Sequence, residues 1–259
     1  MSQVIAITNQ KGGVGKTTTS VNLAATLAEK GHPTLLIDMD PQANAASGLG
    51  LQPAVGSSLY PVMIGQRHIQ EQIQHTNYEN LYHIPAEVDM AGCEIEIAQE
   101  ADPIRKLQHV LEPLRNQQEL EYIILDCPPS VGILMTNSLA AADGLIIPVQ
   151  CEFYALEGIS KILDLIQKMK DQGINPDLRI VGVLMTMFDS RTRLSQQVLQ
   201  ELQQHLPDQV FKTIIPRSIR LSEAPSFGKP ITDYDPNGVG AAAYRQLTEE
   251  FLQRVSGGA

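Results

Sequence analysis

The sequence predicts an α/β fold in which a mostly parallel, twisted sheet carries helices on both faces. Short apolar runs rich in β-branched residues alternate along the chain with segments of helical period. Such alternation is typical of parallel sheets built from strand–helix–strand units. No repeat, low-complexity segment or Pro- or Ser-rich linker interrupts the pattern, so we expect a single domain spanning residues 1–259.

Each predicted strand is a short apolar run, and each predicted helix places apolar residues three or four positions apart. Strands are predicted at 4–8, 34–38, 81–84, 122–126, 144–149, 179–186 and 210–213. Helices are predicted at 17–30, 103–115, 156–170, 194–205 and 239–255. Gly31 is the expected C-terminal cap of the first helix. Segment 52–80 has no clear period, and we expect it to lie over the top of the sheet.

Composition is that of a soluble globular protein with a sizeable core, at 43% hydrophobic and 19% charged residues. The first strand begins close to Met1 without a basic leader, and no apolar run approaches the roughly 18 residues of a membrane span. Three cysteines, Cys93, Cys127 and Cys151, are too few and odd in number for a disulfide framework. We therefore expect a cytoplasmic protein with reduced thiols.

A glycine-rich loop follows the first strand, with the sequence Gln10-Lys11-Gly12-Gly13-Val14-Gly15-Lys16-Thr17-Thr18. In the pattern G-x-x-x-x-G-K-[ST], backbone N–H groups converge on nucleotide phosphates, the lysine reaches the β/γ oxygens and the hydroxyl ligates Mg²⁺. Lys16 and Thr17 fit the last two roles. The loop therefore predicts a P-loop NTPase fold, although Gln10 replaces the first glycine and Lys11 is an additional cation.

Two strand ends supply carboxylates beside this loop. Asp126 ends the apolar strand 122–126, where it can hold Mg²⁺ directly or through water. Asp38 ends the strand 34–38 and Asp40 follows two residues later, and one of them could orient or deprotonate an attacking water. The alternative for Asp38 is a structural one, in which it caps the adjacent helix or binds backbone amides.

Charge is unevenly distributed along the chain. The formal net charge is −10, which by itself argues against a polyanionic partner. Segment 191–229, however, holds six bases and three acids, a net charge of +3, and leaves −13 on the remainder. The bases are Arg191, Arg193, Lys212, Arg217, Arg220 and Lys229. This segment is either a solvated face or a local anion-binding surface.

Five sequence blocks, in order and spread over nearly the whole chain, resemble the deviant Walker A ATPases of the ParA/Soj type, in the MinD/ParA superfamily. The blocks are Lys11 to Thr18, Asp38-Met39-Asp40-Pro41-Gln42, Asp126-Cys127-Pro128-Pro129-Ser130, Cys151-Glu152-Phe153-Tyr154-Ala155-Leu156-Glu157-Gly158, and Leu221-Ser222-Glu223-Ala224-Pro225-Ser226. The resemblance is greatest to the chromosomal Soj branch, which lacks an N-terminal helix-turn-helix domain. It implies an ATPase that partitions chromosomes or plasmids, with ATP and Mg²⁺ as cofactors. We expect slow intrinsic turnover, because the site lacks an obvious strong base.

The resemblance also implies roles for individual residues. Lys11 is expected to cross the interface of an ATP-sandwich homodimer and contact the phosphates bound by the other subunit. Asp40 is expected to position the attacking water and is also a candidate Mg²⁺ ligand, together with Thr17 and the Walker B residue Asp126. With Lys16, these residues form the candidate catalytic set. The expected nucleotide-binding residues are Lys11, Gly12, Gly13, Val14, Gly15, Lys16, Thr17, Thr18 near the α-phosphate, and Pro216 and Ser218 at the adenine.

The basic segment acquires a second interpretation from the same resemblance. Arg191 and Arg220 match positions that bind double-stranded DNA without sequence preference, and only the ATP dimer joins two such patches. Arg193, Lys212 and Arg217 could contribute, although Arg217 could instead face the nucleotide. Aromatic residues are not interleaved with the bases, which argues against base stacking. The implied partner is a ParB/Spo0J-type centromere-binding protein, and the implied location is the nucleoid.

Two alternatives belong to other functional classes. A MinD-like regulator of division would need a basic amphipathic terminal helix to bind lipid, whereas segment 247–259 carries acids and a small-residue tail, so we expect no membrane binding. An iron–sulfur reductase resembling the nitrogenase iron protein would use two cysteines, for which Cys93 and Cys127 are candidates. The glycines that flank the cluster cysteines in that family are missing here.

Overall fold

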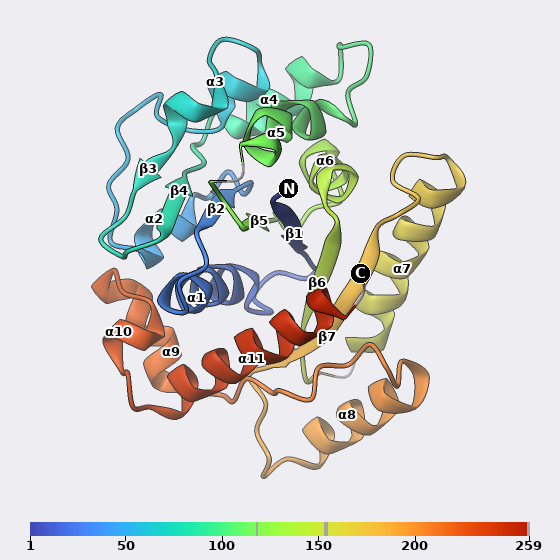
Figure 1. Cartoon of the computed structure of the whole chain (residues 1–259). Helices are drawn as coiled ribbons and strands as arrows, with labels where there is room; N and C mark the ends of the chain where they lie inside the picture. The colour runs from blue at the N-terminus through green and yellow to red at the C-terminus, as the bar shows by residue number, and fades with distance from the viewer. Residues whose placement is uncertain (118, 153–154, 258–259) are drawn as a thin grey trace.

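A seven-stranded sheet in the order β3-β4-β2-β5-β1-β6-β7 forms the centre of the molecule in the computed structural model, which describes residues 1–117, 119–152 and 155–257 (Figure 1). Neighbouring strands are parallel except β3, which pairs antiparallel with β4. The predicted α/β class is confirmed. The strands are β1 Gln3–Ile7, β2 Thr34–Asp38, β3 Gln74–His75, β4 Leu81–Ile84, β5 Tyr122–Asp126, β6 Gly144–Gln150 and β7 Arg179–Thr186.

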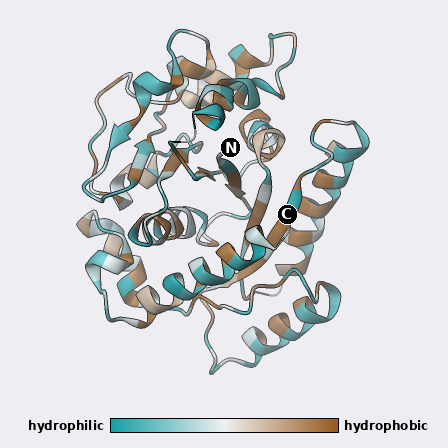
Figure 2. Cartoon of the chain, viewed as in Figure 1, coloured by the Kyte–Doolittle hydropathy of each residue, from teal (hydrophilic) through white to brown (hydrophobic). Residues whose placement is uncertain are grey.

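Helices cover both faces of this sheet, because alternate residues of each strand point to opposite sides. Val4 and Ala6 of β1 pack with α5, α6 and α7, whereas Ile5 and Ile7 pack with α1 and α11. Figure 2 shows apolar colour on the central strands and mixed colour on the surrounding helices. The helices are α1 Lys16–Glu29, α2 Asn44–Gly48, α3 Tyr60–Met63, α4 Met90–Ile97, α5 Lys106–Asn116, α6 Ile133–Ala141, α7 Ala155–Asp171, α8 Arg193–His205, α9 Ile219–Glu223, α10 Ile231–Tyr234 and α11 Val239–Ser256, with 3₁₀ turns η1 Ile69–Gln72 and η2 Ala224–Phe227.

Segment 52–80 differs from its prediction. It contains α3, η1 and β3, and β3 extends the edge of the sheet instead of lying over its top. Val62 and Met63 of α3 are buried in the core beside α4 and α5. These elements are too short to show a period in the sequence, and tertiary packing holds them in place.

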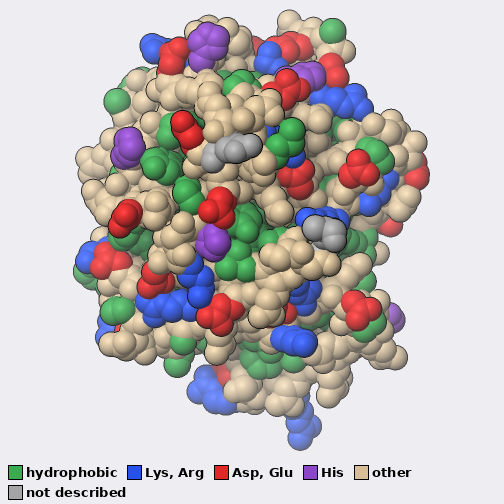
Figure 3. Space-filling model, viewed as in Figure 1, with side chains coloured by type: hydrophobic (Ala, Val, Ile, Leu, Met, Phe, Trp, Pro, Cys, Tyr) green, Lys and Arg blue, Asp and Glu red, His purple; other side chains and the backbone are tan. Residues whose placement is uncertain are grey.

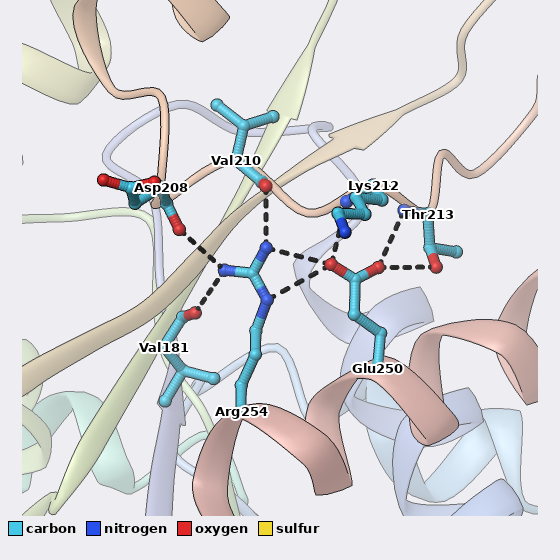
Figure 4. A network of polar contacts seen from close by, with 7 residues as sticks. All are labelled: Val181, Asp208, Val210, Lys212, Thr213, Glu250 and Arg254. Carbon is cyan, nitrogen blue, oxygen red and sulfur yellow. Dashed lines mark hydrogen bonds and ion pairs between the residues drawn. The ribbon is translucent and has the colours of Figure 1, made fainter. Parts of the chain in front are cut away.

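The predicted strand 210–213 is wrong, and Figure 4 shows the reason. Val210 makes one isolated bridge to Val183 of β7, and then the backbone N–H groups of Lys212 and Thr213 donate to the carboxylate of Glu250, each at 2.8 Å. Arg254 holds this carboxylate at 2.9 Å and donates to the carbonyl oxygens of Val181 and Val210. A side-chain network from α11 therefore satisfies backbone groups that a neighbouring strand would otherwise pair.

We expect Glu250→Ala to lower the free energy of unfolding by about 2–4 kcal/mol, because it leaves two backbone donors without their acceptor and the mostly buried Arg254 without its carboxylate partner. Glu249→Ala on the same helix is the matched control. Glu249 is 60% exposed and, among the described residues, its recorded ion pair is with Lys30, so its loss should cost less than about 1 kcal/mol. Urea unfolding of both variants measures the difference, and equal losses would contradict the role of the network.

His83 in β4 is fully buried, and its Nδ1 lies 2.9 Å from the carbonyl oxygen of Leu36, while Nε2 has no partner among the described residues. Burial lowers the pKa of His83 to about 4, from 6.5. As the pH falls, His83 is therefore protonated in the unfolded chain at a higher pH than in the folded chain. The stability contributed by neutral His83 is complete above pH 6.5 and declines between pH 6.5 and 4, by about 3 kcal/mol.

The measurement is the difference in unfolding free energy between the wild type and His83→Gln, which does not titrate. Because buried carboxylates titrate equally in both proteins, their contribution cancels from this difference. We expect the wild type to lose stability relative to the variant as the pH falls from 7 to 4. If the difference in unfolding free energy stays constant over this pH range, the protonation of His83 does not contribute to the pH dependence of stability.

Candidate functional site

The glycine-rich loop joins the carboxyl end of β1 to the N-terminus of α1. Gly13 and Gly15 have φ values of 73° and 86°, which side chains other than glycine rarely adopt, and Gly15 precedes the first residue of α1. The hydroxyl of Thr186 donates to the carbonyl oxygen of Val14 at 2.7 Å and fastens the loop to β7. The N-terminus of α1 thus points its free amides at the space above the loop, a geometry suited to phosphate.

A cavity of about 460 Å³ lies above this loop and is of the size that holds a nucleotide. Lys16 is 7% exposed and contributes to its lining, and its Nζ donates to the carbonyl oxygen of Lys11 at 3.2 Å. Burial lowers the pKa of Lys16, and the nearby Asp126 carboxylate opposes that shift. The cavity is lined by Gly12, Gly13, Gly15, Lys16, Thr17, Thr18, Asp40, Asn44, Pro129, Thr186, Met187, Ile215, Pro216, Arg217, Ser218, Leu221, Ser222, Pro225 and Tyr244.

Asp126 lies at the end of β5, directly opposite Ile7 of β1, and is 1% exposed. Its Oδ1 accepts a hydrogen bond from Ser20 at 2.9 Å, while its Oδ2 accepts none within the part of the chain that the structure describes. Burial raises the pKa of Asp126 to about 6, although the hydroxyls of Thr17 and Ser20 partly oppose the rise. A buried carboxylate oxygen with a free lone pair beside a threonine hydroxyl fits a Mg²⁺ that takes its other ligands from phosphate and water.

The described residues contain no convergence of three His, Cys, Asp or Glu side chains suited to holding a metal. A Mg²⁺ bound with phosphates does not need one, because one or two protein oxygens suffice. Thr17 and Asp126 are therefore the chain's own candidates for this ion.

The two aspartates after β2 have different surroundings. Asp38 is fully buried and accepts hydrogen bonds from the backbone N–H groups of Asp40, at 2.9 Å, and Ala45, at 3.0 Å. Burial raises the pKa of Asp38 well above its usual range, and the charge of Asp126 adds to the shift. Asp38 thus has the structural role considered as its alternative, since it holds α2 against the strand end. Asp40 is half-buried and lines the cavity, and its Oδ1 accepts from the N–H of Gln42.

The additional lysine does not line the cavity of its own chain. Lys11 is about half-exposed, and its ammonium forms an ion pair with Glu152, which follows β6. The loop backbone is held in place here by Asn9, whose Oδ1 accepts from the N–H of Lys11 at 3.0 Å. Lys11 is therefore displayed at the rim of the site on an accessible side chain. Phe153 and Tyr154 of the same sequence block lie outside the described residues.

Pro216 and Ser218 line the same cavity as the loop, and so does Arg217, which favours the nucleotide alternative for that residue. The N–H of Arg217 donates to the carbonyl oxygen of Phe188 at 3.0 Å and fixes this strip beside β7. Sequence reasoning missed Tyr244 of α11, a fully buried residue that also lines the cavity. No sequence signal distinguishes it from an ordinary core position of a helix.

The other basic residues lie at the surface on separate elements. Arg191 precedes α8 and is held by the carboxylate of Asp189, with Nε to Oδ1 at 2.9 Å and Nη2 to Oδ2 at 2.7 Å. Arg220 of α9 pairs with Glu223 at 3.3 Å. Arg193 and Lys212 are exposed, with no ion pair in the described ranges. Figure 3 shows Lys and Arg side chains projecting from the lower edge of the molecule, and α8 and α9 lie in the lower half of Figure 1.

The positions of the thiols argue against the iron–sulfur alternative. Cys93 is fully buried in α4 and Cys127 is 1% exposed after β5, so neither sulfur is presented to a second subunit that would share a cluster. Burial raises the pKa of each thiol to about 12 and keeps it protonated. Within the described residues, no helix combines the length and apolarity that a membrane crossing requires.

A strand–loop–helix phosphate cradle, a buried aspartate on the neighbouring strand and a cavity of nucleotide size define a P-loop nucleotide-binding protein. An AAA-domain family model matches residues 2–180. The chain is 50% identical to the sporulation initiation inhibitor protein Soj of Bacillus subtilis over 251 residues, 96% of this chain and 98% of that protein. It is 48% identical over 255 residues to the chromosome partitioning protein ParA of Myxococcus xanthus, which covers 98% of this chain and 89% of that protein.

Among solved structures, cobyrinic acid a,c-diamide synthase of Mycobacterium smegmatis, with a bound ATP analogue and magnesium, superimposes with a TM-score of 0.86. It is 33% identical and covers 100% of this chain and 98% of its own. The chain belongs to the ParA/Soj family of chromosome-partitioning ATPases.

Proposed function

We propose that this chain is an ATP-switched DNA-binding ATPase that partitions replicated DNA. In this proposal ATP with Mg²⁺ favours a sandwich homodimer, the dimer binds nucleoid DNA without sequence preference, and a ParB/Spo0J-type partner stimulates hydrolysis and release. The names of the relatives support the partitioning role. The bound ATP analogue and magnesium of the similar solved structure support the choice of cofactors.

The observation that carries the proposal is the position of Lys11. Its carbonyl oxygen accepts from Lys16 within the loop, yet its ammonium turns away from the chain's own cavity to Glu152. An accessible cation at the rim of a phosphate site can neutralise charge on a nucleotide held by a second copy, as an arginine finger does. A lysine needed only for the chain's own nucleotide would be expected to line its cavity, as Lys16 does.

The cavity residues divide the chemistry of hydrolysis among them. Lys16 and the loop amides hold the β- and γ-phosphates, and Pro216 and Ser218 contact the base. Thr17 and Asp126 hold Mg²⁺, which supplies charge neutralisation on the phosphate oxygens. Asp40 orients the attacking water from the half-buried end of β2. We expect slow intrinsic turnover, because the described lining of the cavity contains no histidine that could act as a general base beside Asp40. Its one lysine is Lys16, which is assigned to the phosphates.

The basic residues Arg191, Arg193, Lys212 and Arg220 form the proposed DNA surface, and dimerisation doubles the number of phosphate contacts. Each contact is weak and depends on salt, so doubling their number raises affinity steeply. The acidic remainder of the chain disfavours other orientations on DNA.

The test is retardation of a random-sequence duplex by the full chain with ATP and Mg²⁺, compared with ADP and Mg²⁺. We expect binding with ATP and little or none with ADP. Equal binding under both conditions would refute the switch. Preference for one sequence over random duplex would refute non-specific recognition.

The ion pair between Arg191 and Asp189 predicts a gain of function. Asp189→Asn should raise the affinity of the ATP form for duplex DNA several-fold and steepen the salt dependence by about 0.9 in log–log slope, because it frees the Arg191 guanidinium for phosphate. Glu201→Gln is the control, since it removes one exposed acid of the same segment that forms no ion pair in the described ranges. If both variants gain equally, net charge and not pairing is responsible. Fluorescence anisotropy over a salt series measures both quantities.

A further inference from the structure

Two large apolar side chains are exposed in α9 and η2, the elements that hold and follow Arg220. Phe227 is 63% exposed at the end of η2, and Ile219 is 76% exposed directly before Arg220. The Phe227 ring stacks on Tyr234 with a centroid distance of 5.0 Å and an interplanar angle of 29°. The Arg220 guanidinium lies 5.9 Å from the centroid of the same Tyr234 ring. We call Arg220, Phe227 and Tyr234, with the neighbouring Ile219, the aromatic–cation cluster.

Polar contacts hold this cluster in place from below. The Tyr234 hydroxyl donates to Glu223 Oε2 at 3.0 Å, and Arg220 Nη1 donates to the same oxygen at 3.3 Å. Both donors bind the same oxygen, so Glu223 fixes the Tyr234 hydroxyl and the Arg220 guanidinium relative to each other. The tyrosine ring is fixed, and Phe227 rests on it with most of its own surface open to solvent.

The surroundings of the cluster favour a polyanion as the occupant. Arg220 and Lys229 are the cations at the cluster, whereas Arg217 lines the nucleotide cavity. Arg220 pairs with Glu223 at 3.3 Å and Lys229 with Asp233 at 3.3 Å, so each cation can exchange a carboxylate for a phosphate. The apolar part consists of two side chains, which is small beside the ~800 Å² per partner that a stable protein interface buries. Insertion at a base step needs only one ring or one branched aliphatic side chain.

We propose that Phe227 and Ile219 contact DNA bases when the chain binds DNA, so that binding has a salt-independent component beside the phosphate contacts. This inference rests on the proposed function. It also revises the expectation of phosphate contacts alone, because the fold brings Tyr234, which lies outside segment 191–229, under Phe227. Arg220 contacts phosphate, and the adjacent apolar side chains enter the groove and partly unstack a base step.

The experiment separates the two components by a salt series on random-sequence duplex with the full chain, ATP and Mg²⁺. In a plot of log affinity against log salt, the slope counts phosphate contacts and the intercept at 1 M salt reports the remainder. Phe227→Ala should lower the intercept about tenfold and leave the slope unchanged. Arg220→Ala should instead reduce the slope by about 0.9. Phe227→Tyr, which keeps a stacking ring, should retain the wild-type intercept.

Ile95→Ala is the matched control, because Ile95 is 68% exposed on α4, at the opposite end of the molecule from α9 and α10 in Figure 1. A duplex containing 2-aminopurine should brighten when the wild type binds and should not brighten with Phe227→Ala. The inference is overturned if Phe227→Ala keeps the wild-type intercept, or if wild-type binding leaves the fluorescence unchanged.

The alternative occupant is a second copy of the chain. Sedimentation of Phe227→Ala with ATP distinguishes it: loss of the dimer would assign the cluster to a subunit interface and overturn base contact. Failure of the wild type to bind DNA with ATP would overturn the proposed function itself. Wild-type binding with an unaffected Phe227→Ala variant would overturn only the base contact.

Discussion

Asp40→Ala is expected to trap the ATP-bound dimer on DNA and to lower ATP hydrolysis about 100-fold or more, because it removes the residue proposed to orient the attacking water. Nucleotide binding should persist, since Lys16, Thr17 and Asp126 are untouched. Within the described residues, the hydrogen bond recorded to the Asp40 carboxylate comes from the exposed N–H of Gln42, which water can satisfy when the carboxylate is removed. The fold should therefore tolerate the change.

The measurements are phosphate release and the lifetime of the complex with DNA after free ATP is removed. Asp40→Asn is the informative companion, because it retains an oxygen for the Gln42 N–H but not the negative charge. Both variants should show the same trapped state. Undiminished hydrolysis by Asp40→Ala would refute the role of Asp40 and direct attention to another cavity residue.

Lys11→Ala is expected to abolish ATP-dependent dimerisation and to lower partner-stimulated hydrolysis about 1000-fold, the scale of an arginine finger. A single chain should still bind nucleotide, because Lys11 lies outside the cavity lining. This separates it from Lys16→Ala, which should lose nucleotide binding itself, since Lys16 lines the cavity. Nucleotide fluorescence and sedimentation, measured on the same samples, distinguish the two variants.

Glu152→Gln provides the control for Lys11→Ala. It removes the carboxylate that holds the Lys11 ammonium in the free chain, but keeps the lysine. We expect this variant to dimerise with ATP at least as readily as the wild type. A Lys11→Ala chain that forms the ATP dimer normally would exclude a role for Lys11 across the interface.

The central strands and the phosphate loop were predictable because their signals are local. Buried parallel strands are continuous apolar runs, as in β5, and the loop's glycines and Lys16-Thr17 stand at fixed spacing. By contrast, α6 was missed because it is apolar nearly all round, with Leu134, Met135 and Leu139 buried, and so shows no amphipathic period.

Other features depend on contacts between distant residues. The strand predicted at 210–213 fails because the carboxylate of Glu250, on α11, takes its backbone donors. Asp38 and Asp40 look equivalent in sequence, and it is the burial of Asp38 and its bonds from the amides of Asp40 and Ala45 that identify it as structural. The pairing of Lys11 with Glu152 likewise joins residues 141 positions apart, which no local pattern indicates.

The carboxylates that hold Arg191 and Arg220 imply a threshold in the search for DNA. A lone chain would exchange one intramolecular ion pair for one phosphate contact at each arginine, with little net gain in free energy. Under the proposed function, a released chain would therefore have little affinity for DNA until it pairs again. In a dimer, both basic surfaces bind DNA for a single loss of translational freedom. The affinity for DNA therefore rises steeply when two chains dimerise. The paired arginines would thus sharpen the contrast in DNA affinity between the single chain and the dimer.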